Sequence, residues 1–81
     1  MATIFIDGPF RFFFWSKDLF EKMHVHVENA DGMIKIWLPD LTVEIIHAGM
    51  RRKDIDKAVK MVIERYDEIV AKWNEEAGKI R

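Results

Sequence analysis

The hydrophobic pattern of the chain changes once, near Arg52, from a period of two residues to a period of 3.6 residues. Before this point, short alternating or apolar runs are separated by turn-forming residues, which is typical of β-strands. After it, apolar residues fall on one stripe of a helix and charged residues on the opposite side. The change predicts an α+β fold, in which a small, mostly antiparallel sheet packs on one long C-terminal helix.

The first half of the sequence predicts short strands joined by tight connections. The turn-forming segments Asp7-Gly8-Pro9 and Asn29-Ala30-Asp31-Gly32 favour antiparallel neighbours. Residues 10–15 are apolar on both faces, so we expect this strand near the middle of the sheet. Residues 16–22 break the pattern and predict a surface loop or one irregular turn. The predicted strands cover residues 2–6, 10–15, 23–28, 33–38 and 41–46.

The loop at residues 29–32 predicts the register of the hairpin that it closes. Residues directly opposite each other on an antiparallel pair share one face of the sheet. The expected opposite pairs are Glu28 with Met33, His26 with Lys35, and His24 with Trp37. On the following strand, Glu44 should then lie near Lys35.

The second half predicts a single helix over residues 52–77, with Gly78 as its C-terminal cap. One helix covers only one face of a sheet. The other face, or the overhanging helix end around Trp73, is therefore expected to contact a second chain. We expect a homo-oligomer or a small cognate protein partner.

Length and composition restrict the class of protein. A chain of 81 residues predicts one domain over residues 1–81. With a formal net charge of −1, the chain as a whole has no electrostatic attraction to nucleic acid or to an anionic membrane. Nucleic-acid binding would have to come from a local basic patch. Zero cysteines exclude a disulfide framework and a thiolate zinc site. With no signal peptide and no long apolar run, we expect a soluble cytoplasmic protein without membrane contact and without a cofactor.

The segment His24-Val25-His26 is the first candidate for chemistry. Two histidines two residues apart on a strand project to the same side, where both can reach one metal ion. His47 or Asp18 could supply a further ligand, but the spacing does not require it. Because catalytic zinc needs three protein ligands, we predict no metal. The alternative is a pair of half-exposed histidines on the face of the sheet.

The same face could instead carry acid-base or nucleic-acid chemistry. His24 and His26 titrate near neutrality, and Lys35 could stabilise a developing phosphate charge, as in a metal-independent ribonuclease. Exposed aromatic and basic groups could also bind nucleic acid by stacking and phosphate contact. The candidate binding residues are Arg11, Trp15, Trp37, Arg51, Arg52 and Trp73.

The aromatic candidates have a plain alternative, which is burial beneath a neighbouring loop or a dimer partner. The run Arg51-Arg52-Lys53 is typical of a solvated helix start. Cations at this position oppose the helix dipole unless an anion is bound.

Five segments occur in a characteristic order along most of the chain, from Phe10 to about Gly78. They are Phe10-Arg11-Phe12-Phe13-Phe14-Trp15-Ser16, His24-Val25-His26-Val27-Glu28, Lys35-Ile36-Trp37-Leu38-Pro39, Glu64-Arg65-Tyr66-Asp67 and Ala71-Lys72-Trp73-Asn74-Glu75. Together they resemble the small bacterial family catalogued as domain of unknown function 4160. The family usually carries Pro-Pro-His-x-His-Val, and Lys22 and Met23 replace the two prolines here.

The resemblance implies a role in a two-protein system, because members of this family are often suspected to be one half of toxin-antitoxin-like gene pairs. The leading expectation is therefore the toxin-like member of such a pair, which acts through protein-protein interaction. An enzyme that binds or cleaves RNA through His24, His26 and Lys35 comes second, and a metal-binding protein comes third.

Overall fold

A five-stranded antiparallel sheet forms the first half of the protein in a computed structural model that describes residues 2–80. Each strand pairs with its neighbour in the sequence, in the order β1-β2-β3-β4-β5. The strands are β1 (Ala2–Asp7), β2 (Phe10–Phe14), β3 (His24–Glu28), β4 (Met33–Trp37) and β5 (Thr42–His47). The predicted strands are confirmed, and each boundary lies within one residue of its expected position.

The register of the central hairpin is confirmed. His24 lies opposite Trp37, His26 opposite Lys35, and Glu28 opposite Met33. On β5, Glu44 lies opposite Lys35, as expected. β2 is an interior strand next to the middle strand β3, which agrees with the expected position near the middle of the sheet. The apolar residues of β2 are buried on both faces although the strand lies next to the edge strand β1.

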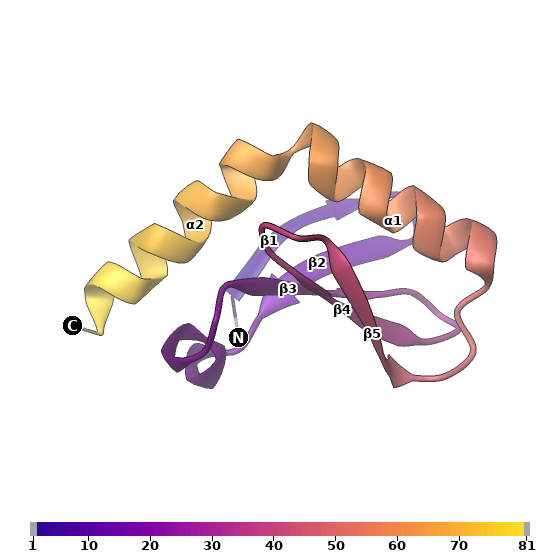
Figure 1. The fold of residues 1–81 in the computed structure, drawn as a ribbon, viewed down its shortest axis with the longest axis horizontal. Coiled ribbons are helices and arrows are strands. Elements are labelled where there is room, and N and C mark those ends of the chain that lie inside the picture. The colour runs from indigo at the N-terminus through magenta and orange to yellow at the C-terminus, as the bar shows by residue number, and fades with distance from the viewer. Residues whose placement is uncertain (1, 81) are drawn as a thin grey trace.

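The prediction of one long helix is wrong. The second half forms two helices, α1 (Arg52–Glu64) and α2 (Tyr66–Lys79), which are separated by Arg65 with φ −114° and ψ 27°. Figure 1 shows the bend between α1 and α2 on the side of the sheet that they share. A straight helix cannot follow a twisted sheet along its whole length, and the bend lets both helices stay in contact. No proline or glycine marks this break in the sequence.

Arg65 is held at the bend by its side chain. Its guanidinium carbon lies 3.4 Å from the centroid of the Phe5 ring, and two of its nitrogens each lie 2.9 Å from a carboxylate oxygen of Glu68. At the other end of α2, Gly78 lies inside the helix, and Ile80 takes the capping position that was predicted for Gly78.

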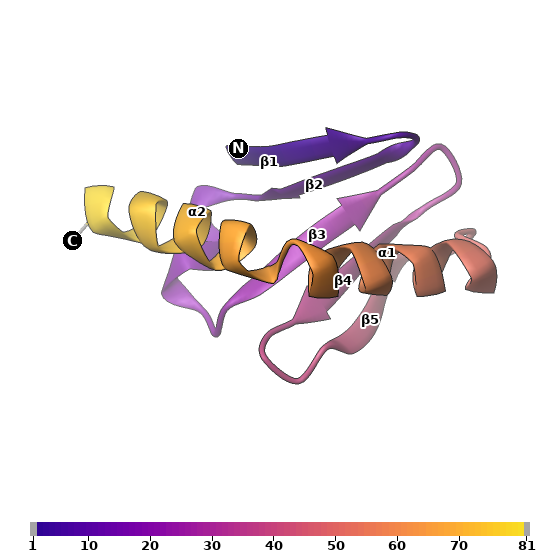
Figure 2. The ribbon, with the colours of Figure 1, turned by 90° about the horizontal axis from the view of Figure 1, so that it is seen from above.

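The main core lies between the sheet and the two helices. Ala58 and Val62 of α1 and Ile69 of α2 are fully buried against it, and burial of a side chain such as Val62 stabilises the fold by about 1.5–3 kcal/mol. Seen from above, α1 and α2 cross β3, β4 and β5 at an angle and run in nearly the same direction as β1 and β2 (Figure 2). The strands contribute Phe5, Phe10, Phe12, Val25, Val27, Ile34 and Ile36 to this core. No helix within residues 2–80 is long and apolar enough to cross a membrane.

A short 3-10 helix, η1 (Ser16–Phe20), occupies the segment for which a loop or irregular turn was predicted. Leu19 of η1 packs with Phe14 of β2 and with Trp73 of α2 in a second, smaller core. The neighbouring residue Asp18 accepts a hydrogen bond from the backbone N–H of Trp15 at 2.8 Å. These contacts join η1 to the sheet and to α2, and they place Asp18 beside the His-x-His segment.

Candidate metal centre

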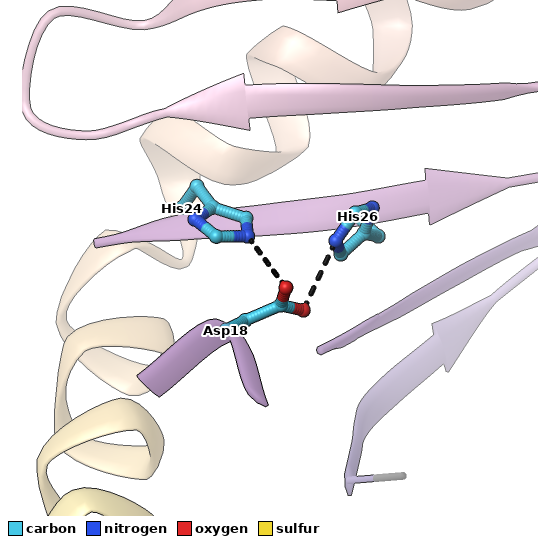
Figure 3. Close-up of side chains that lie close together, drawn as sticks. All are labelled: Asp18, His24 and His26. Atoms are coloured by element: carbon cyan, nitrogen blue, oxygen red, sulfur yellow. Dashed lines mark hydrogen bonds and ion pairs between the residues drawn. The ribbon is translucent and has the colours of Figure 1, made fainter. Parts of the chain in front are cut away.

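Three side chains that can bind a metal meet beside η1. Asp18 comes from η1, and His24 and His26 come from β3. Figure 3 shows the carboxylate of Asp18 directed at both imidazole rings. The potential ligand atoms of the three residues lie within 4.8 Å of one another. All three residues are buried, with exposed fractions of 2% for Asp18, 0% for His24 and 4% for His26.

The two carboxylate oxygens of Asp18 contact different histidines. Oδ2 lies 3.1 Å from Nε2 of His26, and Oδ1 lies 3.3 Å from Nε2 of His24. The Asp18–His26 contact has the geometry of a hydrogen bond, whereas Nε2 of His24 has no hydrogen-bond partner within residues 2–80. One buried carboxylate therefore faces two ring nitrogens, but it satisfies only one of them.

The backbone determines which nitrogen of His24 carries the proton. Nδ1 of His24 lies 2.8 Å from the carbonyl oxygen of Lys22. A carbonyl oxygen only accepts, so Nδ1–H must donate, and Nε2 of the neutral ring keeps its lone pair. This lone pair faces the carboxylate of Asp18. Two acceptors face each other in a buried place, and a shared proton or a bound cation would turn this unfavourable contact into a favourable one.

His26 has the opposite arrangement. Its Nε2 faces Asp18, and its Nδ1 is buried without a hydrogen-bond partner among the described residues. Burial lowers the pKa of His26 below its ordinary value of 6.5, and the nearby His24 and Lys35 lower it further, although Asp18 opposes them. His26 is therefore predominantly neutral at pH 7. Neutral imidazole is the form in which histidine binds a metal, and a metal on Nε2 of His26 would place the ring proton on Nδ1.

Aromatic rings enclose the two histidines. The His26 ring stacks on Phe13 with centroids 5.4 Å apart and meets the edge of Trp15 at 4.7 Å. The His24 ring lies 4.7 Å from Trp37 and 5.5 Å from Trp73. This apolar wall restricts the rotation of both imidazoles and weakens the competition from water.

The remaining predicted catalytic residue, Lys35, lies on the same face of the sheet as the histidines but makes other contacts. Its side chain is 14% exposed, and Nζ lies 4.6 Å from the centroid of the Trp37 ring and 4.0 Å from a carboxylate oxygen of Glu21. The structure thus brings His24 and His26 together with Asp18, while the ammonium group of Lys35 is directed at Trp37 and Glu21.

The predicted binding residues fall into two groups. Trp15, Trp37 and Trp73 all contact the histidine rings. Trp73 is only 4% exposed, because it packs on Phe14 and His24 of its own chain, so this part of α2 offers little surface to a partner. Arg11 donates to Glu28 at 2.9 Å and lies over the Phe13 ring.

The basic residues near the start of α1 form the other group. Arg51 and Arg52 lie at the N-terminus of α1, away from the histidines in sequence and in fold. Both are exposed, and Arg52 pairs with Asp56 at 3.2 Å.

The separations in the cluster are short enough for the three residues to bind one metal ion. Ligand atoms at ~2.0–2.2 Å from a tetrahedral ion lie about 3.3–3.6 Å apart. The two Asp18–His contacts, which different carboxylate oxygens make, are 3.1 Å and 3.3 Å, and the potential ligand atoms all lie within 4.8 Å of one another. The backbone carbonyl that accepts from Nδ1–H of His24 is the partner that commonly orients a metal-binding histidine. Two histidines and one carboxylate suit zinc and other first-row divalent ions.

Asp18 is the candidate ligand that spacing alone could not assign. The sequence offered it only as one of two possible additional ligands, and the other, His47, lies exposed on β5. The 3-10 turn brings Asp18 under β3, and a turn of this kind has no strong hydrophobic period to reveal it.

Comparison with known proteins identifies the family and nothing more specific. No curated protein and no solved structure gave a significant match. A family model described as Domain of unknown function (DUF4160) matches residues 10–74. This range includes the whole of η1, β3 and α1. The match covers most of the chain, so the protein belongs to the family Domain of unknown function (DUF4160).

Proposed function

We propose that this protein binds one divalent first-row transition-metal ion, of the Zn²⁺ class, through Asp18, His24 and His26. The observation that carries the proposal is the orphaned Nε2 of His24, which is fully buried and faces a carboxylate oxygen at 3.3 Å. The hydrogen bond to Lys22 fixes the ring with its metal-binding nitrogen toward that carboxylate. A cation between these groups would compensate the buried charge of Asp18.

The burial of the three ligands favours a structural role for the ion. A bound ion would supply positive charge and would connect η1 with β3. Since Leu19 of η1 packs against Trp73, this connection would also support the position of α2. A ligand that binds only the folded state stabilises it by about 2.7 kcal/mol when its concentration is 100 times its Kd.

The test uses protein purified without a polyhistidine tag and stripped with a chelator. Titration with Zn²⁺ should give one bound ion per chain by calorimetry, together with a rise in melting temperature. Co²⁺ in place of Zn²⁺ should produce the visible absorption of a tetrahedral nitrogen and oxygen site. Asp18→Asn and His24→Ala should each abolish both signals.

Two variants serve as matched controls. His47→Ala removes an exposed histidine, and Asp40→Asn removes a carboxylate that forms an exposed ion pair with Lys22 at 3.2 Å. Both should bind Zn²⁺ like the unchanged protein. Binding that survives Asp18→Asn, or that is lost in His47→Ala, would place the ion elsewhere and refute the proposal.

The open edge of the sheet supports a second function, which the resemblance described above also implies. We propose that the protein also acts as the toxin-like member of a two-protein pair and binds a partner protein. The supporting observation is β5, an edge strand that carries Ile45 at 61% and Ile46 at 37% exposure. Co-expression with the product of the neighbouring gene should yield a complex by sedimentation and relief of any growth inhibition. A protein that neither inhibits growth nor binds this product would contradict the pairing.

The burial of the histidines bears on the RNA-cleaving alternative. A general acid or base must come within hydrogen-bond distance of the substrate, and side chains that are 0% and 4% exposed cannot do so without movement of η1. The contacts of His24 and His26 therefore favour metal binding over direct contact with RNA. RNA cleavage that persists in chelator and disappears in His26→Ala would reverse this preference.

A further inference from the structure

We propose that the open edge of β5 binds an extended acidic segment of a partner protein, whose aliphatic side chains enter a groove between β5 and α1. This inference deepens the partner-binding function proposed above and rests on it, and it is independent of the metal centre. Three observations support it, namely an unpaired strand edge, an apolar groove beside that edge, and a run of basic residues near one end of the groove.

The edge of β5 is suited to accept another strand. β5 pairs only with β4 in the five-stranded order, so one row of its backbone groups faces outward. Its register is regular from Thr42 to Ile45, and its irregularity lies beyond this stretch. The opposite edge, β1, has its irregularity in the middle, between Thr3 and Phe5, and such irregularities obstruct pairing with a further strand.

An apolar groove of about 340 Å³ runs beside this edge on the helical side of the sheet. Val43 and Ile45 form one wall, and Ile55 and Val59 of α1 form the other. A strand added to β5 would direct every second side chain toward this groove, because side chains alternate between the two faces. Aliphatic side chains at those positions would cover Ile45, which is 61% exposed.

The charges near the groove indicate the chemistry of the partner. α1 begins after Arg51 without a side-chain cap, and Arg51 and Lys53 form no ion pair among residues 2–80. Arg52 lines the groove together with Asp56, with which it pairs at 3.2 Å. Cations at the N-terminus of a helix are unfavourable unless an anion compensates them. Asp54 supplies one carboxylate in the first turn of α1, against Arg51 and Lys53, and carboxylates of a partner would supply the rest.

A second copy of the chain is a poorer occupant of this edge. In β5 the only carboxylate is Glu44, which lies on the opposite face from the groove and accepts a hydrogen bond from Trp37. A symmetric pairing centred on Glu44 would put two carboxylates directly opposite each other, which is destabilising. The β5 strand of a second copy therefore directs no acidic side chain toward the groove that could pair with Arg51 and Lys53.

The experiment selects ligands from a displayed library of random ten-residue peptides against the intact protein. Enriched peptides should alternate aliphatic and polar residues and carry Asp or Glu at one end. The best peptide, made synthetically and titrated by NMR, should shift amides of β5 and of the first turn of α1. Its affinity should fall as salt rises.

Two matched variants locate the site. Ile45→Lys should weaken the selected peptide by about tenfold or more, whereas Ile6→Lys, at an equally exposed position on β1, should leave it within about twofold. The pair Arg51→Glu with Lys53→Glu should weaken the acidic peptide and remove most of its salt dependence.

Several results would overturn the inference. These are enrichment of basic peptides or of none, shifts on β1 or η1, and self-association that Ile45→Lys abolishes, which would identify a second copy as the occupant. Binding of an RNA oligonucleotide at Arg51 and Lys53 in preference to the peptide would also overturn it. A cognate partner that binds Ile45→Lys normally would refute this surface while leaving the proposed pairing intact.

Discussion

Replacement of Asp18 by alanine should lower the free energy of unfolding of the metal-free protein by about 3 kcal/mol. The carboxylate accepts hydrogen bonds from the Trp15 backbone at 2.8 Å and from His26 at 3.1 Å. Hydrogen bonds to a charged group contribute about 1.5–3 kcal/mol each. Because the variant also escapes the cost of burying a carboxylate, the lower end of the sum applies.

This loss is large for a chain of 81 residues, whose total stability is expected to be about 4–12 kcal/mol. It corresponds to a fall in melting temperature of about 12–24 °C. Urea unfolding at pH 7 in the presence of a chelator, followed by tryptophan fluorescence and circular dichroism, measures it. Asp40→Ala is the control, because its exposed ion pair should contribute no more than about 1 kcal/mol.

Asp18→Asn separates the roles of shape and charge. An amide oxygen can still accept the Trp15 N–H but carries no charge for a metal. We expect it to recover part of the stability lost in Asp18→Ala and none of the metal binding. If Asp18→Ala lowers the free energy of unfolding no more than Asp40→Ala does, the Asp18 carboxylate does not hold η1 on the sheet, and the reasoning is refuted.

Further predictions concern His26, Trp73 and the bend at Arg65. The folded-state pKa of His26 is lowered, so the unfolded state binds more protons. The metal-free protein should therefore lose stability as pH falls below about 6.5. A His26→Gln variant whose urea midpoint depends on pH as strongly as that of the unchanged protein would disprove this. Trp73→Ala should cost about 3–5 kcal/mol by thermal unfolding, as for a buried core residue, and a loss below about 1 kcal/mol would mean that α2 does not dock through this ring. Arg65→Pro should lower the melting temperature, followed by circular dichroism, at least as much as Val62→Pro, because the Arg65 N–H donates to the carbonyl oxygen of Met61 at 2.9 Å. An Arg65→Pro variant as stable as the unchanged protein would contradict the hydrogen bonding at the bend.

The fold was largely predictable because its elements depend on local patterns. Alternation and turn residues predicted every strand, and the four-residue loop predicted which residues lie opposite His24 and His26. The break at Arg65 was not predictable from the sequence, since the apolar stripe continues through it and the cause is the twist of the sheet. Tertiary packing also buries Trp73 against Phe14, Leu19 and His24, whereas the sequence pattern places it on an overhanging helix end.

The candidate site was predictable only in part. A period of two puts His24 and His26 on one face, but it does not show what covers that face. Asp18 reaches them through a 3-10 turn, and the direction of its carboxylate depends on the hydrogen bond from Trp15. The tautomer of His24 depends on the carbonyl of Lys22, a backbone group without any sequence signal. The third candidate ligand and the orphaned nitrogen therefore emerge only from the fold.

The metal content of the purified protein tests the central claim most directly. Untagged protein, loaded with Zn²⁺ and then dialysed against metal-free buffer, should retain one ion per chain by elemental analysis. Asp18→Asn, treated in parallel, should retain none, and His47→Ala should retain one. Equal metal content in the unchanged protein and in Asp18→Asn would contradict the account.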